Sequence, residues 1–467
     1  MKRILLIVLS LLVLLAPLPA GEEETQTSYT FDSLRESMRE GNAELRKERE
    51  TYAQSLLDVK DAKANYQPQI SLLLSGTYMP NPPIGKTTIG VDELSSQLGI
   101  TVPGSAAGEY VTLYKGMSDL YYNAGLTITQ PIFTWGKIPK AVALYTEIAS
   151  IRALSVEDSA DKLSVELRTR LTAKCYMDEL FSLIKETKAA ADELVGMSES
   201  AYENGMLLRE DVTKAKISAL EIDVKEQELK KEYSDNLKSL QTITANDDIA
   251  GGNIDYSVNE DEINAIASLD RDDVMALVTR SDSATISMLK GQTRAYELKK
   301  EIAEASLYWK PDFALQVSLT YGGSSMPLVE KNWYRTNDYG LYLTFAISTT
   351  IWDGGVKLND VKRAASEVAG TLADYDSAVA QLTESAEENL SQIQLSRVKL
   401  EYYSLKLEEA EERLDLLTRQ YEGGLISRTD VLSQEIEVLT EKMTIIEEKI
   451  TLSQAAYTIA YLTGILE

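Results

Sequence analysis

The eleven prolines of this 467-residue chain are confined to a few places. None lies between residues 140 and 310, and none follows residue 327. A proline inside a helix removes a backbone N–H and clashes with the preceding turn, so the two proline-free tracts are free to form long helices. In the second tract, apolar residues recur in alternating steps of three and four from Leu400 to Tyr421 and again from Leu432 to Ile450. This spacing predicts helices that pack as coiled coils.

One phrase occurs twice in these tracts, as AYENGMLLREDV at 201–212 and as QYEGGLISRTDV at 420–431. The two copies are 219 residues apart, and each stands where an apolar seam stops and restarts. Gly205 and the pair Gly423–Gly424 supply the permissive backbone of a helix end and a tight turn. Asp211 and Asp430 then fall in the first turn of the next helix, where a carboxylate favours the positive end of the helix dipole. The phrase therefore predicts the tip of a helical hairpin, built twice.

Four other segments alternate apolar with small or polar residues, as half-buried strands do. They lie at 70–75, 121–128, 313–321 and 339–348. The apolar residues of the last two are Phe313, Leu315, Val317, Leu319, Leu341, Leu343, Phe345 and Ile347. For one such segment alone, a half-buried sheet in a soluble domain would be the better explanation. Four of them in two pairs, each joined by a loop and flanked by long helices, favour transmembrane strands whose apolar set faces lipid.

Four strands are too few for a barrel, because the smallest bacterial barrels have eight. An open strand edge in lipid would leave backbone N–H and C=O groups without partners. Several copies of the chain must therefore pool their strands.

Composition excludes several classes of function. The formal net charge is −26, histidine is absent, and Cys175 is the only cysteine. Nucleic acid is excluded as a partner because binding it requires a basic footprint. The chain has neither an internal disulfide nor a cysteine-based zinc site, and we expect no cofactor and no catalytic residue.

The charged, apolar and small-residue order of residues 1–20 predicts a secretory signal peptide, with a signal anchor as the alternative.

Both halves of the chain show the same order of helix, strand, loop, strand, long helix, tip and helix. The two copies are 243 residues apart at their first strand turns (66–68 and 309–311) and 219 residues apart at their tips. The loop at 81–120, which is longer than its counterpart at 323–337, explains this difference of 24 residues. The predicted signal peptide is 1–20, and the first repeat is 21–245, with its strand pair at 68–133 and its tip at 203–208. Residues 246–270 form an acidic linker or equatorial element whose charge serves solvation. The second repeat is 271–467, with its strand pair at 311–350 and its tip at 422–427.

The order of elements, the IWDGG run at 351–355 and the YxxGxxxxxDV phrase in both copies resemble the TolC family of outer-membrane efflux proteins. The resemblance implies a mostly α-helical homotrimer whose twelve strands form one barrel in outer-membrane lipid, continued by an α-helical tunnel into the periplasm. Such a channel passively conducts substrates from an inner-membrane transporter and a periplasmic adaptor, in tripartite efflux or type I secretion. The first copy reads FTWGK at 133–137, and its missing glycine predicts an altered bend between strand and helix.

The resemblance also assigns roles to the tips. Family members often place an acidic ring near the tunnel entrance, and Asp430 matches that position, with Asp211 as its counterpart in the first copy. In some members an arginine ties the entrance shut. The matching residue here is Ile426, and Arg428 or Arg209 is the candidate substitute. The alternative role of both aspartates is to complement helix N-termini.

We expect the tips to present an apolar surface on which the adaptor docks. This surface consists of Asn204, Gly205, Met206, Gly423, Gly424 and Leu425. Turns that serve only as helix caps are the alternative. For the whole chain, the alternatives are an envelope-spanning coiled-coil tether without a pore and an exported enzyme. The sequence does not distinguish a drug, metal, siderophore or protein as substrate.

Overall fold

The computed structural model describes residues 28–80, 83–101, 104, 108–116, 119–251, 253–280, 283–323 and 339–465. The predicted signal peptide and residues 324–337 of the second predicted loop lie outside these residues. The chain divides into two compact units. The first lies within Met1–Tyr52, Arg152–Leu289 and Tyr375–Glu467, and the second within Ala53–Ile151 and Lys290–Asp374.

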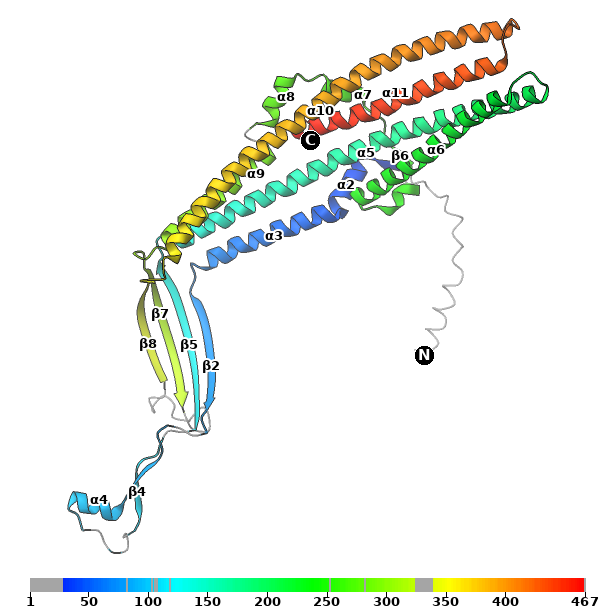
Figure 1. Cartoon of the computed structure of the whole chain (residues 1–467). Coiled ribbons are helices and arrows are strands. Elements are labelled where there is room, and N and C mark those ends of the chain that lie inside the picture. The colour runs from blue at the N-terminus through cyan, green and yellow to red at the C-terminus, as the bar shows by residue number, and fades with distance from the viewer. Residues whose placement is uncertain are drawn as a thin grey trace, which may run out of the picture. The chain divides into compact units, whose positions relative to one another are not determined.

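A four-stranded antiparallel sheet dominates the second unit (Figure 1). Its members are β2 (Gln69–Tyr78), β5 (Leu120–Phe133), β7 (Asp312–Gly323) and β8 (Tyr339–Ser348), in the order β2–β5–β7–β8. Valine, isoleucine, leucine and aromatic residues at every second position suit such a pleated, half-covered surface. The central β5–β7 contact joins the two halves of the chain, so each half contributes one outer strand.

Further elements stand between β2 and β5, where the sequence predicted a loop. They are β3 (Thr87–Gly90), α4 (Val91–Leu98) and β4 (Tyr110–Tyr114). Strands β3 and β4 pair in antiparallel fashion, with Ile89 opposite Val111. The prediction of a plain loop is wrong here, because strands of four and five residues are too short to give a clear alternation.

The two proline-free tracts form long helices, as predicted. They give two helical hairpins, α5 (Lys137–Glu203) with α6 (Arg209–Thr244) and α10 (Val356–Glu422) with α11 (Arg428–Thr463). Helices α3 (Ala43–Ala64) and α9 (Ala284–Ala305) precede the two strand pairs. The predicted fold class, duplicated helical hairpins with four strands, is confirmed. None of the helices in the described part of the chain combines the length and the apolar character needed to cross a bilayer.

The two hairpins differ in how their helices meet. In α11, Glu441 and Glu448 are buried and lie 2.6 and 3.2 Å from lysines of α10. The equivalent residues of α6, 219 positions earlier, are Ile222 and Leu229, which are buried in an apolar cluster with α5. The first hairpin therefore has an apolar seam, and the second has a seam with buried carboxylates.

The acidic segment at 246–270 is folded onto the first unit. It contains a 3-10 helix (Asp247–Gly251), β6 (Asn253–Asp255) and α7 (Glu260–Ala267), and it lies near β1 (Ser28–Thr30), α2 (Phe31–Gly41) and α8 (Arg271–Val278). Strand β6 pairs in parallel with β1. Glu262 lies 2.5 Å from Arg168, and Glu260 lies 2.8 Å from Lys449. Two carboxylates of the segment therefore help to hold it on the helices of the first unit.

Candidate functional site

The pairing register of the sheet determines which side chains share a face, because directly opposed residues of antiparallel strands point to the same side. Val317 lies opposite both Leu343 and Ile128, and Ile128 also lies opposite Ile70. One face of all four strands is therefore apolar. It carries Ile70, Leu72, Leu74, Leu126, Ile128, Phe313, Leu315, Val317, Leu319, Leu341, Leu343, Phe345 and Ile347. Most residues of the opposite face are serine, threonine, glycine, alanine or glutamine.

This apolar face has the dimensions of a membrane-spanning surface. Leu343 is 72% exposed and Leu72 is 65% exposed in the single chain. The 12 residues of β7 extend over roughly 36 Å, or about 28 Å of membrane thickness at the tilt of about 40° found in outer-membrane barrels. Aromatic residues stand at both ends of the face, namely Tyr78, Tyr122, Tyr321 and Tyr339 at the loop end and Phe133 and Phe313 at the helix end. Aromatic girdles around an apolar band are typical of outer-membrane strands.

The sheet has two open edges. Within the described residues, neither β2 nor β8 pairs with a strand on its outer side. Each edge therefore leaves a row of backbone donors and acceptors next to the apolar face.

The bend from β5 into α5 is built without the expected glycine. Trp135 has a φ of 54°, close to the 72° of its counterpart Gly354. This left-handed conformation costs roughly 1–2 kcal/mol for a residue with a Cβ. The indole Nε1 donates a hydrogen bond to the carbonyl oxygen of Pro311 at 2.9 Å, and the ring centroid lies 5.2 Å from that of Phe133. The prediction of an altered bend is therefore wrong, because these contacts hold Trp135 in the conformation of a glycine.

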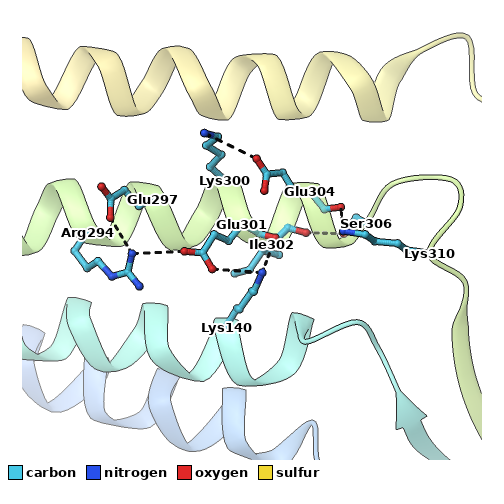
Figure 2. Close-up of polar contacts among 9 residues, drawn as sticks. All are labelled: Lys140, Arg294, Glu297, Lys300, Glu301, Ile302, Glu304, Ser306 and Lys310. Carbon is cyan, nitrogen blue, oxygen red and sulfur yellow. Dashed lines mark hydrogen bonds and ion pairs between the residues drawn. The ribbon is translucent and has the colours of Figure 1, made fainter.

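Ion pairs join the elements at the helix end of the sheet. The Nζ of Lys137 lies 2.8 Å from both carboxylate oxygens of Asp312, the first residue of β7. Figure 2 shows Lys140 of α5 and Arg294 of α9 at the two oxygens of Glu301, at 3.4 and 3.5 Å. Partly exposed pairs of this kind contribute little individually. Together they tie α5 to α9 and to the start of β7.

The two hairpin tips have the same backbone structure. Met206 and Leu425 each donate their backbone N–H to the carbonyl five residues earlier, at 2.9 Å. Gly205 and Gly424 have φ values of 72° and 71°. A left-handed glycine with this hydrogen bond is a common end of an α-helix. Both tips therefore reverse the chain in the same way.

Each tip also presents an exposed apolar side chain beside its glycine. Met206 is 76% exposed and Leu425 is 78% exposed. Leu208, 70% exposed, extends the first tip; it was missed because its counterpart in the second copy is the polar Ser427. Gly423 does not have a positive φ, and neither does its counterpart Asn204. Of the pair Gly423–Gly424, only Gly424 therefore needs the backbone freedom of glycine.

The two tip aspartates hold the starts of the second helices. The Oδ2 of Asp430 accepts hydrogen bonds from the backbone N–H and the hydroxyl of Ser427, at 3.1 and 2.6 Å. The hydroxyl of Ser427 in turn accepts from the backbone N–H of Asp430 at 3.3 Å, which completes a capping box. The Oδ2 of Asp211 accepts from the backbone N–H of Leu208 at 3.2 Å. Both carboxylates therefore have at least the local capping role.

Arg428 connects the two hairpins near their tips. Its Nε lies 3.3 Å from the carboxylate of Glu193 in α5. Sequence reasoning missed Glu193, because it lies 235 positions away and outside the repeated phrase. Arg209 forms no ion pair with any residue that the structure describes. Its neighbour Glu210 pairs with Lys214 at 2.7 Å, and this hydrogen bond lowers the pKa of the Glu210 carboxyl.

The fold and the apolar sheet face define a membrane protein with long helical hairpins. The family model described as outer membrane efflux protein matches residues 34–246 and 284–465, and the chain belongs to this family. It is a non-enzymatic efflux channel of the outer membrane, with a long periplasmic extension. Across the residues described, no three metal-binding side chains are grouped so as to hold an ion.

Solved structures show the same fold at low identity. The chain is similar to CusC (12% identity, TM-score 0.71, covering 96% of this chain and 97% of that chain). It is also similar to VceC of Vibrio cholerae (14%, 0.68, 93% and 96%) and to the outer membrane channel CmeC of Campylobacter jejuni (14%, 0.69, 96% and 90%). A comparison with curated proteins gave no significant match.

Proposed function

We propose that three copies of the chain close one barrel and one helical tunnel, through which substrate passes without any chemistry by the channel. The observation that carries this proposal is the apolar sheet face between two open edges. In lipid, each unpaired backbone group at these edges costs several kcal/mol. Pairing β8 of one copy with β2 of the next removes this cost. Three copies pool twelve strands, which lies within the range of bacterial barrels.

The internal duplication predicts the register of this contact between copies. Adding 243 to the residue numbers of β2 and 219 to those of β5 converts the β2–β5 pairs into the observed β7–β8 pairs. Adding 219 to the residue numbers of β5 and subtracting 243 from those of β7 converts the β5–β7 pairs into pairs between β8 and the β2 of a neighbouring copy. The resulting register places Leu343 opposite Tyr78, Phe345 opposite Gly76 and Ile347 opposite Leu74. In the single chain a Cβ at Gly76 would meet nothing within 4 Å, so the neighbour's Phe345 has room there.

The helices support the same arrangement. In α6, Ile217, Leu220 and Val224 form an exposed apolar stripe. Their counterparts in α11 are Ile436, Leu439 and Met443, all of them buried. Helix α11 shares an apolar cluster with α5, whose own counterpart is α10. The exposed apolar residues of α10 include Leu395, Val398, Tyr402 and Leu405. We therefore place the α6 stripe against α10 of the neighbouring copy.

Two arginine substitutions on adjacent residues test the lipid-facing role of the apolar face. Leu343 lies on that face and Thr344 on the opposite one. We expect Leu343→Arg to prevent assembly in the outer membrane, at a cost of roughly 2–4 kcal/mol near the bilayer midplane. Thr344→Arg places its charge in the aqueous lumen and should leave the trimer intact. The measurement is the amount of trimer in outer-membrane fractions, and equal amounts for both variants would contradict the assignment.

We propose that the tips form the tunnel entrance. Three copies of Asp430, with Asp211 at the equivalent position of the first tip, would concentrate negative potential in a narrow opening. The Arg428–Glu193 pair supports a role in holding the two hairpins together at this entrance, and Arg209 is the weaker candidate because it forms no ion pair with described residues. Cations should therefore pass the entrance more readily than anions.

Single-channel conductance in a planar bilayer measures this preference. Asp430→Asn keeps an oxygen that accepts the capping hydrogen bond but removes the charge, so it should weaken cation selectivity without unfolding the tip. Arg428→Ala should increase the conductance or the open time, whereas Arg209→Ala serves as the control. Unchanged selectivity in Asp430→Asn would contradict the acidic ring but not the proposed pore.

We propose that a periplasmic adaptor, which in turn binds the inner-membrane transporter, docks on the tips. The exposed Met206 and Leu425 beside Gly205 and Gly424 offer an apolar surface that allows close approach. Gly424→Trp adds bulk at this surface, and Gly424→Ala is the control for backbone strain alone. Adaptor crosslinking and export should fall only in the tryptophan variant. If both persist at the wild-type level in a Gly424→Trp trimer, the adaptor docks elsewhere.

A further inference from the structure

The β3–α4–β4 hairpin lies in the longer of the two loops that join paired strands, at 81–120. It accounts for the greater length of this loop relative to its counterpart at 323–337. Strand β2 begins after α3, and β5 ends before α5, so the helices adjoin one end of the sheet. The hairpin connects the opposite ends of β2 and β5, and it therefore lies at the end of the sheet away from the helices. With the helices in the periplasm, the hairpin stands on the outer side of the membrane.

The hairpin is a built continuation of β2 and β5. The backbone N–H of Met79 donates to the carbonyl of Asp119 at 2.7 Å, beyond the last pair of the sheet. Gly116 has a φ of 82°, and a Cβ there would lie 2.8 Å from the backbone nitrogen of Lys86. Only glycine permits this close approach at the neck of the hairpin. The element is therefore held in a defined place at the mouth of the sheet.

The surface of the hairpin is apolar on both sides. All five residues of β4 are exposed, including Leu113 and Tyr114. Over the regular part of the strand side chains alternate, so Tyr110 points to one side and Val111, opposite Ile89, to the other. Leu98 and Ile100, at the end of α4, are also exposed. A two-stranded hairpin is at best marginally stable in water by itself. An ordered hairpin with apolar side chains on both sides therefore requires a partner.

Position and charge identify a second copy of the chain as that partner. The hairpin follows directly from β2, the outer strand that pairs with a neighbour's β8 in the proposed trimer, so it emerges at the seam between copies. Every copy brings its hairpin to the same end of the barrel. Between residues 83 and 116 the sequence has two lysines and three acidic residues, although the whole chain carries a formal charge of −26. Repulsion between copies is therefore small at this element.

We propose that the β3–α4–β4 hairpins of neighbouring copies pack on one another through Tyr110, Leu113 and Tyr114 and form a cap at the outer mouth of the channel. This inference rests on the proposed trimeric pore. The cap narrows the exit, and substrate leaves when the hairpins separate.

Crosslinking between copies tests the cap. In a Cys175→Ser background, Leu113→Cys in the detergent-extracted trimer is treated with a short bis-maleimide. We expect a dimer band on denaturing gels for Leu113→Cys and none for Ser96→Cys, an exposed polar position on α4 of the same hairpin. Single-channel recording of Leu113→Asp, which places like charges in the cap, should show a larger conductance than the parent channel.

The outcomes separate the cap from the pore. A conducting trimer without the Leu113→Cys crosslink, and with unchanged conductance in Leu113→Asp, would overturn the cap and leave the proposed function standing. Protection of the Leu113→Cys thiol from maleimide only when outer-membrane lipid is added would assign the apolar surface to lipid and likewise overturn the cap. A monomeric protein without conductance would overturn both proposals.

Discussion

At the scale of single residues, Trp135 shows how one conformation is reached by two different side chains. Its counterpart Gly354 adopts a left-handed φ without a steric cost, whereas Trp135 requires the hydrogen bond to Pro311 and the ring contact with Phe133. Propensity favours glycine at such a bend. At Trp135, the hydrogen bond to Pro311 and the contact with Phe133 stabilise the left-handed conformation despite the low propensity of tryptophan for it.

Substitutions of Trp135 should separate the backbone and side-chain contributions. Trp135→Phe keeps a ring but loses the indole donor, which we expect to cost about 0.5–1.5 kcal/mol. Trp135→Ala loses the side-chain contacts and keeps the left-handed strain, so it should be less stable than Trp135→Gly by about 1 kcal/mol. Thermal unfolding of the detergent-extracted oligomer measures the order. Equal midpoints for the alanine and glycine variants would show that the backbone conformation carries no cost.

At the scale of elements, the two hairpins use one backbone pattern with different seams. In the second hairpin the buried hydroxyl of Ser396 donates to Glu448 at 2.6 Å, and Lys399 lies 3.2 Å from the same carboxylate. The equivalents of Ser396 and Glu448 in the first hairpin are Met177 and Leu229, both buried in an apolar cluster. The polar seam therefore depends on keeping all of its partners together.

Exchange of the seam tests this dependence. Glu448→Leu alone leaves the buried hydroxyl of Ser396 without an acceptor and should cost about 1–3 kcal/mol. Adding Ser396→Met reproduces the pair found in the first hairpin and should recover most of that loss, because replacing both partners by apolar groups is nearly neutral. Chemical unfolding of the two variants and of Ser396→Met alone gives the coupling free energy. Strictly additive effects would contradict the proposed partnership.

The sequence predicted elements best where a pattern was long. Alternation over nine residues of β7 was enough to predict the shared apolar face that the register shows, and the repeated phrase located both tips. Contacts between distant segments left no local signal. Trp135 and Pro311 are 176 positions apart, and Arg428 and Glu193 are 235 apart. The short strands β3 and β4 were missed for a related reason, since four or five residues carry too little alternation.

At the scale of the whole molecule, the chain is a duplicated unit that lacks one neighbour on each side. The first half meets the second through β5 and β7, and the duplication requires an equivalent partner for β8 and β2. The exposed stripe of α6 has a buried counterpart in α11, which gives the same requirement in the helices. Closure by identical copies satisfies both. The central claim is therefore that a ring of this chain forms the pore.

A disulfide across the predicted seam between copies tests this claim most directly. In a Cys175→Ser background, Thr344→Cys with Thr77→Cys places two thiols opposite each other in the predicted β8–β2 register, at a separation that a disulfide can bridge. Thr344→Cys with Ser71→Cys, offset by roughly 20 Å along the strand, is the control. We predict covalent trimers after mild oxidation in outer-membrane fractions for the first pair and uncrosslinked chains for the second. Monomers from both pairs, in a protein that still conducts, would contradict closure of the barrel by neighbouring copies in this register.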